Sequence, residues 1–93
     1  MSDLAHLRAF VHGKVQGVYY RAFVSHVAKA LSLKGFVRNM PDGGVELEVE
    51  GEKKDIEKLL MQLHIGPPEA VVEKIDTVWS VYRGLYQSFD VRY

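Results

Sequence analysis

Two spacings of apolar residues alternate along this chain of 93 residues, and they restrict the folds that are open to it. In residues 20–31 the apolar side chains recur three and four positions apart, which predicts an α-helix with one buried face, and residues 56–63 repeat this pattern. Residues 45–50 instead alternate strictly between an aliphatic residue and glutamate, which predicts a strand with one buried face. Further apolar runs at 7–12, 35–38, 70–82 and 87–92 also predict strands.

Turn-forming residues separate these segments. Gly13 and Gly17 lie in the first connection, residues 39–44 are dense in turn formers, and residues 66–68 (Gly-Pro-Pro) end the second helix. The resulting order is β-α-β-β-α-β with an extra C-terminal strand. We therefore predict a single domain over residues 1–93 with an α+β, ferredoxin-like fold. In this fold two helices cover one face of a mainly antiparallel sheet.

Two further expectations concern the outer face of the sheet and the end of the chain. The glutamates of residues 46–50 are expected to form the solvated face of their strand. The C-terminal strand, which ends on Arg92 and Tyr93, can lie beside the first strand. Its terminal carboxylate can then brace Arg21.

Composition excludes several classes of protein. Twelve Lys and Arg balance twelve Asp and Glu, so the net charge is zero, which argues against a polycationic nucleic-acid binder. The absence of Cys excludes disulfide staples and thiolate metal sites, and the four histidines show no metal-ligand spacing. No apolar run approaches the roughly 20 residues of a membrane helix, and no secretory leader is recognisable. We therefore expect a cytoplasmic protein that binds no metal, no membrane and no nucleic acid.

The zero net charge conceals an uneven distribution of charge along the chain. Residues 1–40 hold six cations against one acid, a net charge of +5, whereas residues 41–60 hold seven acids against three lysines, a net charge of −4. A binding site for a small anion is therefore expected in the first part of the chain.

The connection between the first strand and the first helix, residues 13–21 (GKVQGVYYR), has the composition of an anion cradle. Glycines let a backbone approach a ligand closely, and the first amides of a helix have no partners within the helix. Arg21 adds a guanidinium that suits phosphate oxygens. The spacing of a Walker loop is absent, so nucleotide hydrolysis by that route is not expected. From local physics alone, a phosphate cradle and a tight turn with a solvated Arg21 are equally supported.

Four segments carry a resemblance to a known family. Residues 13–21 read G-x-V-Q-G-V-x-x-R, residues 35–46 read G-F-V-R-N and then D-G-x-V-E, residues 66–72 read G-P-P-x-A-x-V, and residues 89–93 read F-x-V-R-Y. In this order and spacing they resemble the acylphosphatase family over nearly the whole chain. One departure is Ser32, which stands where many members have a glycine that caps the first helix.

The resemblance implies an enzyme that hydrolyses small acyl phosphates to a carboxylate and inorganic phosphate, without a metal or another cofactor. It implies that Arg21 binds the phosphoryl group and that Asn39 orients the attacking water. Backbone amides are expected to complete the phosphate site, and this implied set is Gln16, Gly17, Val18, Tyr19, Tyr20 and Arg21. We further expect a monomer that accepts many acyl groups, because so small a chain leaves little room for a specificity pocket. Inorganic phosphate, the product, is expected to inhibit it.

Other readings stay open at this level. Tyr19 either lines the site or lies on the surface, and His12 adjoins the loop without an assigned role. A ferredoxin-like module that binds RNA or a small anion without catalysis is one alternative, although the aromatic segment typical of RNA binding is absent. A carbamoyl-phosphate-processing domain of a larger assembly is another, which the absence of linkers disfavours.

Overall fold

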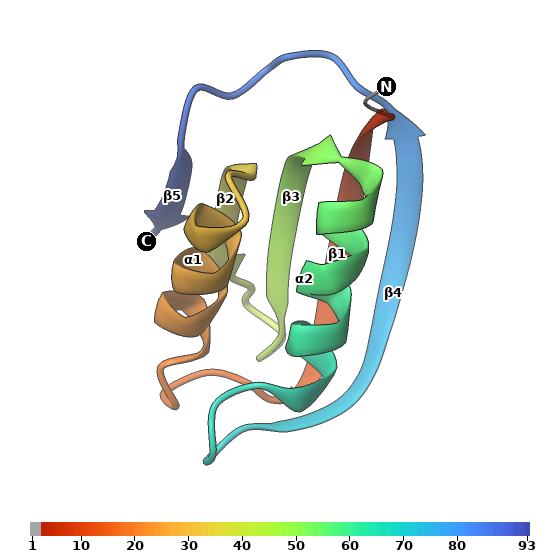
Figure 1. Cartoon of the computed structure of the whole chain (residues 1–93). Coiled ribbons are helices and arrows are strands. Elements are labelled where there is room, and N and C mark those ends of the chain that lie inside the picture. Colours follow the sequence, from red (N-terminus) through yellow and green to blue (C-terminus); the bar gives the residue numbers. More distant parts are fainter. Residues whose placement is uncertain (1–2) are drawn as a thin grey trace.

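The computed structural model describes residues 3–93 and shows two helices packed on one face of a five-stranded sheet (Figure 1). The elements follow the predicted order: β1 (Leu4–Lys14), α1 (Tyr20–Ala30), β2 (Lys34–Asn39), β3 (Val45–Glu52), α2 (Lys53–Ile65), β4 (Val71–Val81) and β5 (Phe89–Arg92). The predicted ferredoxin-like fold is thereby confirmed. Neither helix in this part of the chain combines the length and hydrophobicity that crossing a bilayer requires.

The strand order is β4-β1-β3-β2-β5. β1 pairs antiparallel with β3 on one side and with β4 on the other, and β2 pairs antiparallel with β3. β5 pairs in parallel with β2, so the expectation that the last strand lies beside the first is wrong. Both edges of β1 are already occupied, and residues 82–88 carry the chain across the end of the sheet to the free edge of β2 (Figure 1).

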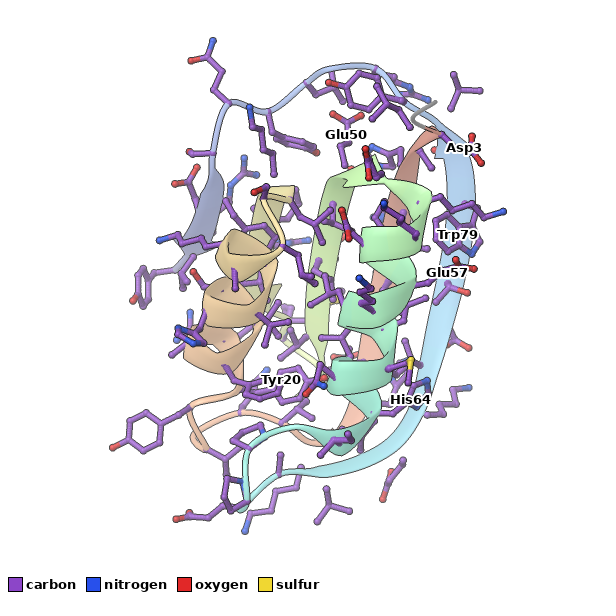
Figure 2. All side chains as sticks on the ribbon, in the orientation of Figure 1. Asp3, Tyr20, Glu50, Glu57, His64 and Trp79 are labelled. Atoms are coloured by element: carbon purple, nitrogen blue, oxygen red, sulfur yellow. The ribbon has the colours of Figure 1, made fainter. Side chains whose placement is uncertain are left out.

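The core lies between the helices and the inner face of the sheet. Both predicted helical stripes face it: α1 buries Tyr20, Val24 and Ala28, and α2 buries Ile56, Leu59 and Leu63. Ser25, which lies outside the apolar stripe of α1, is buried as well. The hydroxyl of Tyr20 donates a 2.8 Å hydrogen bond to the carbonyl of Leu63 (Figure 2). Burial raises the pKa of Tyr20 far above its ordinary value, so this hydroxyl stays a donor. The bond joins the first turn of α1 to the end of α2.

α1 ends in a left-handed turn of the kind that glycine favours. Ser32 has a φ of 58° and its amide donates to the carbonyl of Lys29 at 3.0 Å, while the amide of Leu33 donates to Ala28 at 2.9 Å. These two bonds form a Schellman motif that is completed by the buried side chain of Leu33. The serine that departs from the family pattern therefore adopts a backbone conformation that costs a residue with a Cβ about 1 kcal/mol.

Ser32→Gly should stabilise the fold. Glycine adopts this conformation without strain but loses more freedom on folding, so we expect a net gain of about 0.5–1 kcal/mol. For a domain of this size the gain corresponds to a rise of about 2–8 °C in melting temperature, measured by circular dichroism. Ser32→Ala keeps the Cβ and should not reproduce the rise. A lower melting temperature for Ser32→Gly would contradict the assigned strain.

The outer face of the sheet, away from the helices, carries an ionic network built on two buried glutamates. Glu46 and Glu50 are each only 2% exposed. Glu46 accepts hydrogen bonds from Arg8 at 2.8 Å and from Arg38 at 2.6 Å, and these side chains reach over it from β1 and β2. The prediction of a solvated glutamate face is therefore wrong. Alternation does turn these residues away from the helices, but the long side chains of neighbouring strands cover them.

Glu50 holds the segment that crosses the end of the sheet. Its carboxylate accepts the backbone amides of Arg83 and Leu85, both at 2.9 Å (Figure 2). His6 lies between Glu50 and Glu48, with each ring nitrogen 3.0 Å from a carboxylate oxygen. The path of residues 82–88 toward β5 thus depends on a carboxylate of β3.

Acid should weaken the fold through these carboxylates. Burial by itself raises the pKa of Glu46, but the hydrogen bonds and charges of Arg38 and Arg8 hold it below its ordinary value of 4.5. Burial also raises the pKa of Glu50, but the hydrogen bonds from Arg83, His6 and Leu85 together outweigh it, so the pKa is lowered. A carboxyl group whose pKa is lower in the folded than in the unfolded protein stabilises the fold at any pH above the unfolded pKa. This contribution is lost as the pH falls through the folded pKa. The free energy of unfolding, measured in urea, should therefore decrease below about pH 4.5.

Glu46→Gln separates this effect from general acid denaturation. The variant should be less stable than the wild type at neutral pH, and the difference should shrink on acidification because the wild-type carboxyl then becomes neutral too. Glu57→Gln, on the exposed face of α2, is the matched control and should follow the wild-type curve. A stability difference for Glu46→Gln that does not change with pH would show that the ionised form contributes nothing.

Candidate active site

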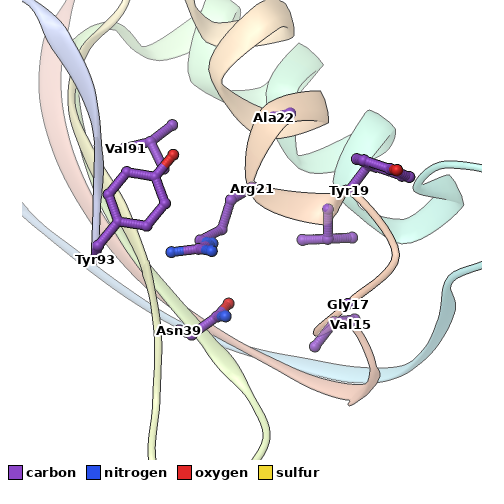
Figure 3. A pocket seen from close by; sticks show the side chains of 9 residues that line it. Val15, Gly17, Tyr19, Arg21, Ala22, Asn39, Val91 and Tyr93 are labelled. Atoms are coloured by element: carbon purple, nitrogen blue, oxygen red, sulfur yellow. The ribbon is translucent and has the colours of Figure 1, made fainter.

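A pocket of about 380 Å³ opens between the loop that precedes α1, the end of β2 and the C-terminus (Figure 3). It is lined by Val15, Gly17, Tyr19, Tyr20, Arg21, Ala22, Asn39, Val91 and Tyr93. The structure thus brings both predicted catalytic residues into one pocket with most of the predicted loop. Gln16 and Val18 are not among the lining residues. Sequence reasoning missed Val91 and the ring of Tyr93, because no sequence signal shows that β5 pairs with β2.

The loop that enters α1 passes through backbone conformations of alternating hand. Gly17 has a φ of 71° and Tyr19 a φ of 61°, whereas Val18 and Tyr20 lie outside the positive-φ region. Alternation of this kind turns successive N–H groups toward one concave side, a nest that suits an anion. Gly17 adopts its positive φ without strain, and no other group lies within 4 Å of the place a Cβ would take. Glycine is therefore needed here for conformation and not for space.

The first turn of α1 leaves backbone donors without partners. Tyr19 occupies the N-cap position and its side chain caps no amide, and the first turn holds no acidic residue. These amides lie at the positive end of the helix dipole, next to the nest. Val18, only 4% exposed, fixes the loop to the core. The positive-φ residues Gly17 and Tyr19 and the start of α1 thus lie together at the pocket, a combination suited to bind an anion.

Arg21 is held at the pocket by the end of the chain. Its guanidinium donates a 2.9 Å hydrogen bond to the carbonyl of Arg92, and its Cζ lies 4.6 Å from the ring centre of Tyr93 (Figure 3). Within residues 3–93 no carboxylate, the C-terminal one included, lies at ion-pair distance from Arg21. The C-terminus does brace Arg21, but through a carbonyl and an aromatic ring. The positive charge of Arg21 is left for a ligand.

Asn39 stands at the end of β2, opposite Val45 in β3, and lies near Arg21 in the pocket (Figure 3). Its Oδ1 is buried and has no hydrogen-bond partner. A buried carbonyl oxygen without a donor is costly, so this atom is suited to accept from a molecule that enters the pocket. The preceding residue, Arg38, faces the opposite side of the sheet and pairs with Glu46 at 2.6 Å.

The side chain of Gln16 links the loop to the turn that follows Asn39. Its Nε2 donates to the carbonyl of Met40 at 2.7 Å and to the carbonyl of Gly44 at 2.8 Å. The same turn is closed by the amide of Met40, which donates to Gly44 at 2.8 Å. The sequence placed Gln16 at the site for its backbone amide, whereas the structure shows a side-chain role that holds the two sides of the pocket together.

His12 takes no part in the pocket, although it adjoins the loop in sequence. Its Nε2 lies 3.0 Å from a carboxylate oxygen of Asp76 in β4. Within residues 3–93, no three His, Asp or Glu side chains are grouped in a way that could hold a metal ion.

Comparison with known proteins decides the family. The family model for acylphosphatases matches residues 7–91. The chain belongs to the acylphosphatase family. An acylphosphatase of Anaeromyxobacter dehalogenans is 40% identical over 93 residues, which cover the whole of both chains. The family match contains every lining residue of the pocket except Tyr93.

Solved structures of family members agree with this fold. An acylphosphatase from Bacillus subtilis superposes with a TM-score of 0.92 at 32% identity, covering 98% of this chain and 100% of that one. An acylphosphatase from Coxiella burnetii gives a TM-score of 0.91 at 38% identity, covering 97% and 94%. The family predicted from the four sequence segments is therefore confirmed.

Gln16→Glu should loosen the link between the loop and the turn. An ionised carboxylate has nearly the shape of the amide but cannot donate to the two carbonyls, so we expect a loss of about 1–3 kcal/mol in the free energy of unfolding. Gln62→Glu, on the exposed side of α2, is the matched control and should cost far less. Equal stability of the two variants, measured in urea, would mean that the Gln16 bonds add nothing to the fold.

Proposed function

We propose that this chain hydrolyses small acyl phosphates to a carboxylate and inorganic phosphate. The observation that carries the proposal is the meeting, in one pocket, of a backbone nest, a guanidinium without a carboxylate partner and a buried carbonyl oxygen without a donor. The first two suit a phosphoryl group, and the third suits a water molecule beside it. Membership of the acylphosphatase family supports the same reaction.

The phosphoryl group would bind between the loop amides and Arg21. In phosphoryl transfer the charge is spread over the three equatorial oxygens, and catalysis consists mainly of positioning and electrostatic stabilisation. The backbone amides of residues 16–21 supply fixed donors, and Arg21 supplies a full charge whose position is set by Arg92 and Tyr93. These groups need no reorganisation when charge develops, because the fold already holds them.

Asn39 would orient the attacking water. Its Oδ1 accepts a hydrogen bond from the water, which turns a lone pair of the water oxygen toward phosphorus. The new oxygen–phosphorus bond forms as the bond to the acyl oxygen breaks, and the electron pair of that bond leaves with the carboxylate. A proton of the water passes to a phosphoryl oxygen. The leaving carboxylic acid has a pKa of about 4, so its anion departs without a strong general acid. A pocket without an acid–base pair is sufficient for such a substrate.

Substitutions at the two proposed catalytic residues should affect different steps. Arg21→Ala should abolish measurable turnover and weaken the binding of inorganic phosphate, because the charge that holds the phosphoryl group is gone. Asn39→Ala should lower kcat by about 10²–10³-fold with a smaller change in KM, because only the water loses its partner. Circular dichroism should show both variants folded. A kcat of Asn39→Ala near that of the wild type would exclude the role in orienting water.

Benzoyl phosphate in the presence of EDTA is the direct test of the reaction. We expect hydrolysis at an undiminished rate, since Arg21 and the amides supply the stabilising charge, and we expect competitive inhibition by inorganic phosphate. Alkyl phosphate monoesters and diesters are the comparison substrates and should react far more slowly, because their alkoxide leaving groups are much more basic than a carboxylate. A folded protein that binds phosphate but does not turn over benzoyl phosphate would be a binding module and not a hydrolase.

A further inference from the structure

Tyr19 combines a strained backbone with an exposed aromatic side chain. Its φ of 61° lies in the left-handed region, which a bulky residue adopts at a cost. The side chain is 83% exposed and lies at the edge of the pocket. The nest explains the backbone conformation, but it does not explain why the residue is a tyrosine and not a glycine or an asparagine, which tolerate this conformation better.

Packing and hydrogen bonding do not explain the tyrosine either. Within residues 3–93, the side chain of Tyr19 makes no ring contact, cation contact or hydrogen bond. Its neighbour Tyr20 is different: that ring is buried and its hydroxyl is bonded to Leu63. An exposed ring that stands on a strained backbone at the rim of a pocket points to contact with a ligand.

The geometry of the reaction indicates which part of the ligand reaches Tyr19. The attacking and leaving oxygens of a phosphoryl transfer lie roughly in line with phosphorus. With water held at Asn39, the acyl group leaves on the side of the phosphoryl group away from Asn39. In Figure 3, Asn39 and Ala22 lie on opposite sides of the Arg21 side chain, and Tyr19 and Tyr93 stand on the two flanks of the opening. The acyl group therefore emerges toward a rim that carries two exposed tyrosines.

We propose that the ring of Tyr19 contacts the acyl group and gives this enzyme a preference for aromatic acyl phosphates over short aliphatic ones. The proposal rests on the proposed function and refines it, because the sequence alone predicts broad acceptance. A flat apolar acyl group stacks on the ring, whereas an acetyl group is too short to cover it. Tyr19 is thus a specificity-determining residue, and its backbone amide serves the phosphoryl group in either case.

The test compares kcat/KM for benzoyl phosphate and acetyl phosphate in four proteins. These are the wild type, Tyr19→Asn, Tyr19→Phe and Tyr82→Asn. Asparagine tolerates the left-handed backbone and removes the ring, whereas phenylalanine keeps the ring and removes the hydroxyl. Tyr82 is another exposed tyrosine, on the segment that crosses the end of the sheet, and does not line the pocket. The ratio between substrates cancels any change that the substitution imposes on phosphate binding.

We expect the wild type to favour benzoyl phosphate, and Tyr19→Asn to lower the benzoyl-to-acetyl ratio by about two- to tenfold. Tyr19→Phe and Tyr82→Asn should keep the wild-type ratio. The melting temperature of Tyr19→Asn should not fall, since strain is relieved and no packing is lost.

Three results would overturn the proposal. They are an unchanged ratio in Tyr19→Asn, an equal loss for both substrates with a lower melting temperature, and a ratio that falls as far in Tyr19→Phe. Each of these leaves hydrolysis by the wild type intact, so the proposed function would stand. If the wild type hydrolyses neither substrate, the proposed function fails and the specificity role fails with it.

Discussion

The parallel pairing of β5 with β2 is the contact on which the pocket depends. It brings the last residues of the chain to the end of β2, where the carbonyl of Arg92 and the ring of Tyr93 hold Arg21. The chain reaches that edge only by crossing the end of the sheet, and the crossing segment is bound to Glu50 through two backbone amides. A buried carboxylate on the outer face therefore helps to set the position of a guanidinium in the pocket.

The distribution of paired and unpaired charge separates the two faces of the molecule. On the outer face, the buried carboxylate of Glu46 pairs with the half-exposed guanidinium groups of Arg8 and Arg38. In the pocket, Arg21 has no carboxylate partner among the described residues, and Asn39 has an oxygen without a donor. The uneven distribution of charge along the sequence thus corresponds to a difference between the two faces of the folded molecule. Glu46 and Glu48 pair with the arginines of the outer face, whereas Arg21 in the pocket keeps its charge for a ligand, which suits an anion site.

Hydrophobic periodicity predicted most of the fold, because each helix and strand buries one face against a common core. It predicted both helical stripes and the order of the elements. It failed for the glutamates of β3, since a period of two says which face a residue takes but not what covers that face. It also failed for β5, because strand order depends on which edges remain free after β1 has two neighbours. Gln16 was placed at the site by its motif, but its side-chain bonds to Met40 and Gly44 depend on a turn 24 residues away.

The sequence by itself determined the family, the α+β fold and the residues of the loop, because the motif 13–21 and the apolar spacing are local properties of the chain. Only the tertiary structure decided which groups meet. The partner of Arg21 is a carbonyl 71 residues away, and its position follows from a parallel strand pair that no local pattern encodes. Packing between distant segments also leaves the buried Oδ1 of Asn39 without a donor. The path of the loop into α1 places Tyr19 in the left-handed region at the rim of the pocket. Distances between distant segments, and the burial of their side chains, are set only when the strands pair and the helices pack on the sheet. The local sequence pattern therefore does not contain them.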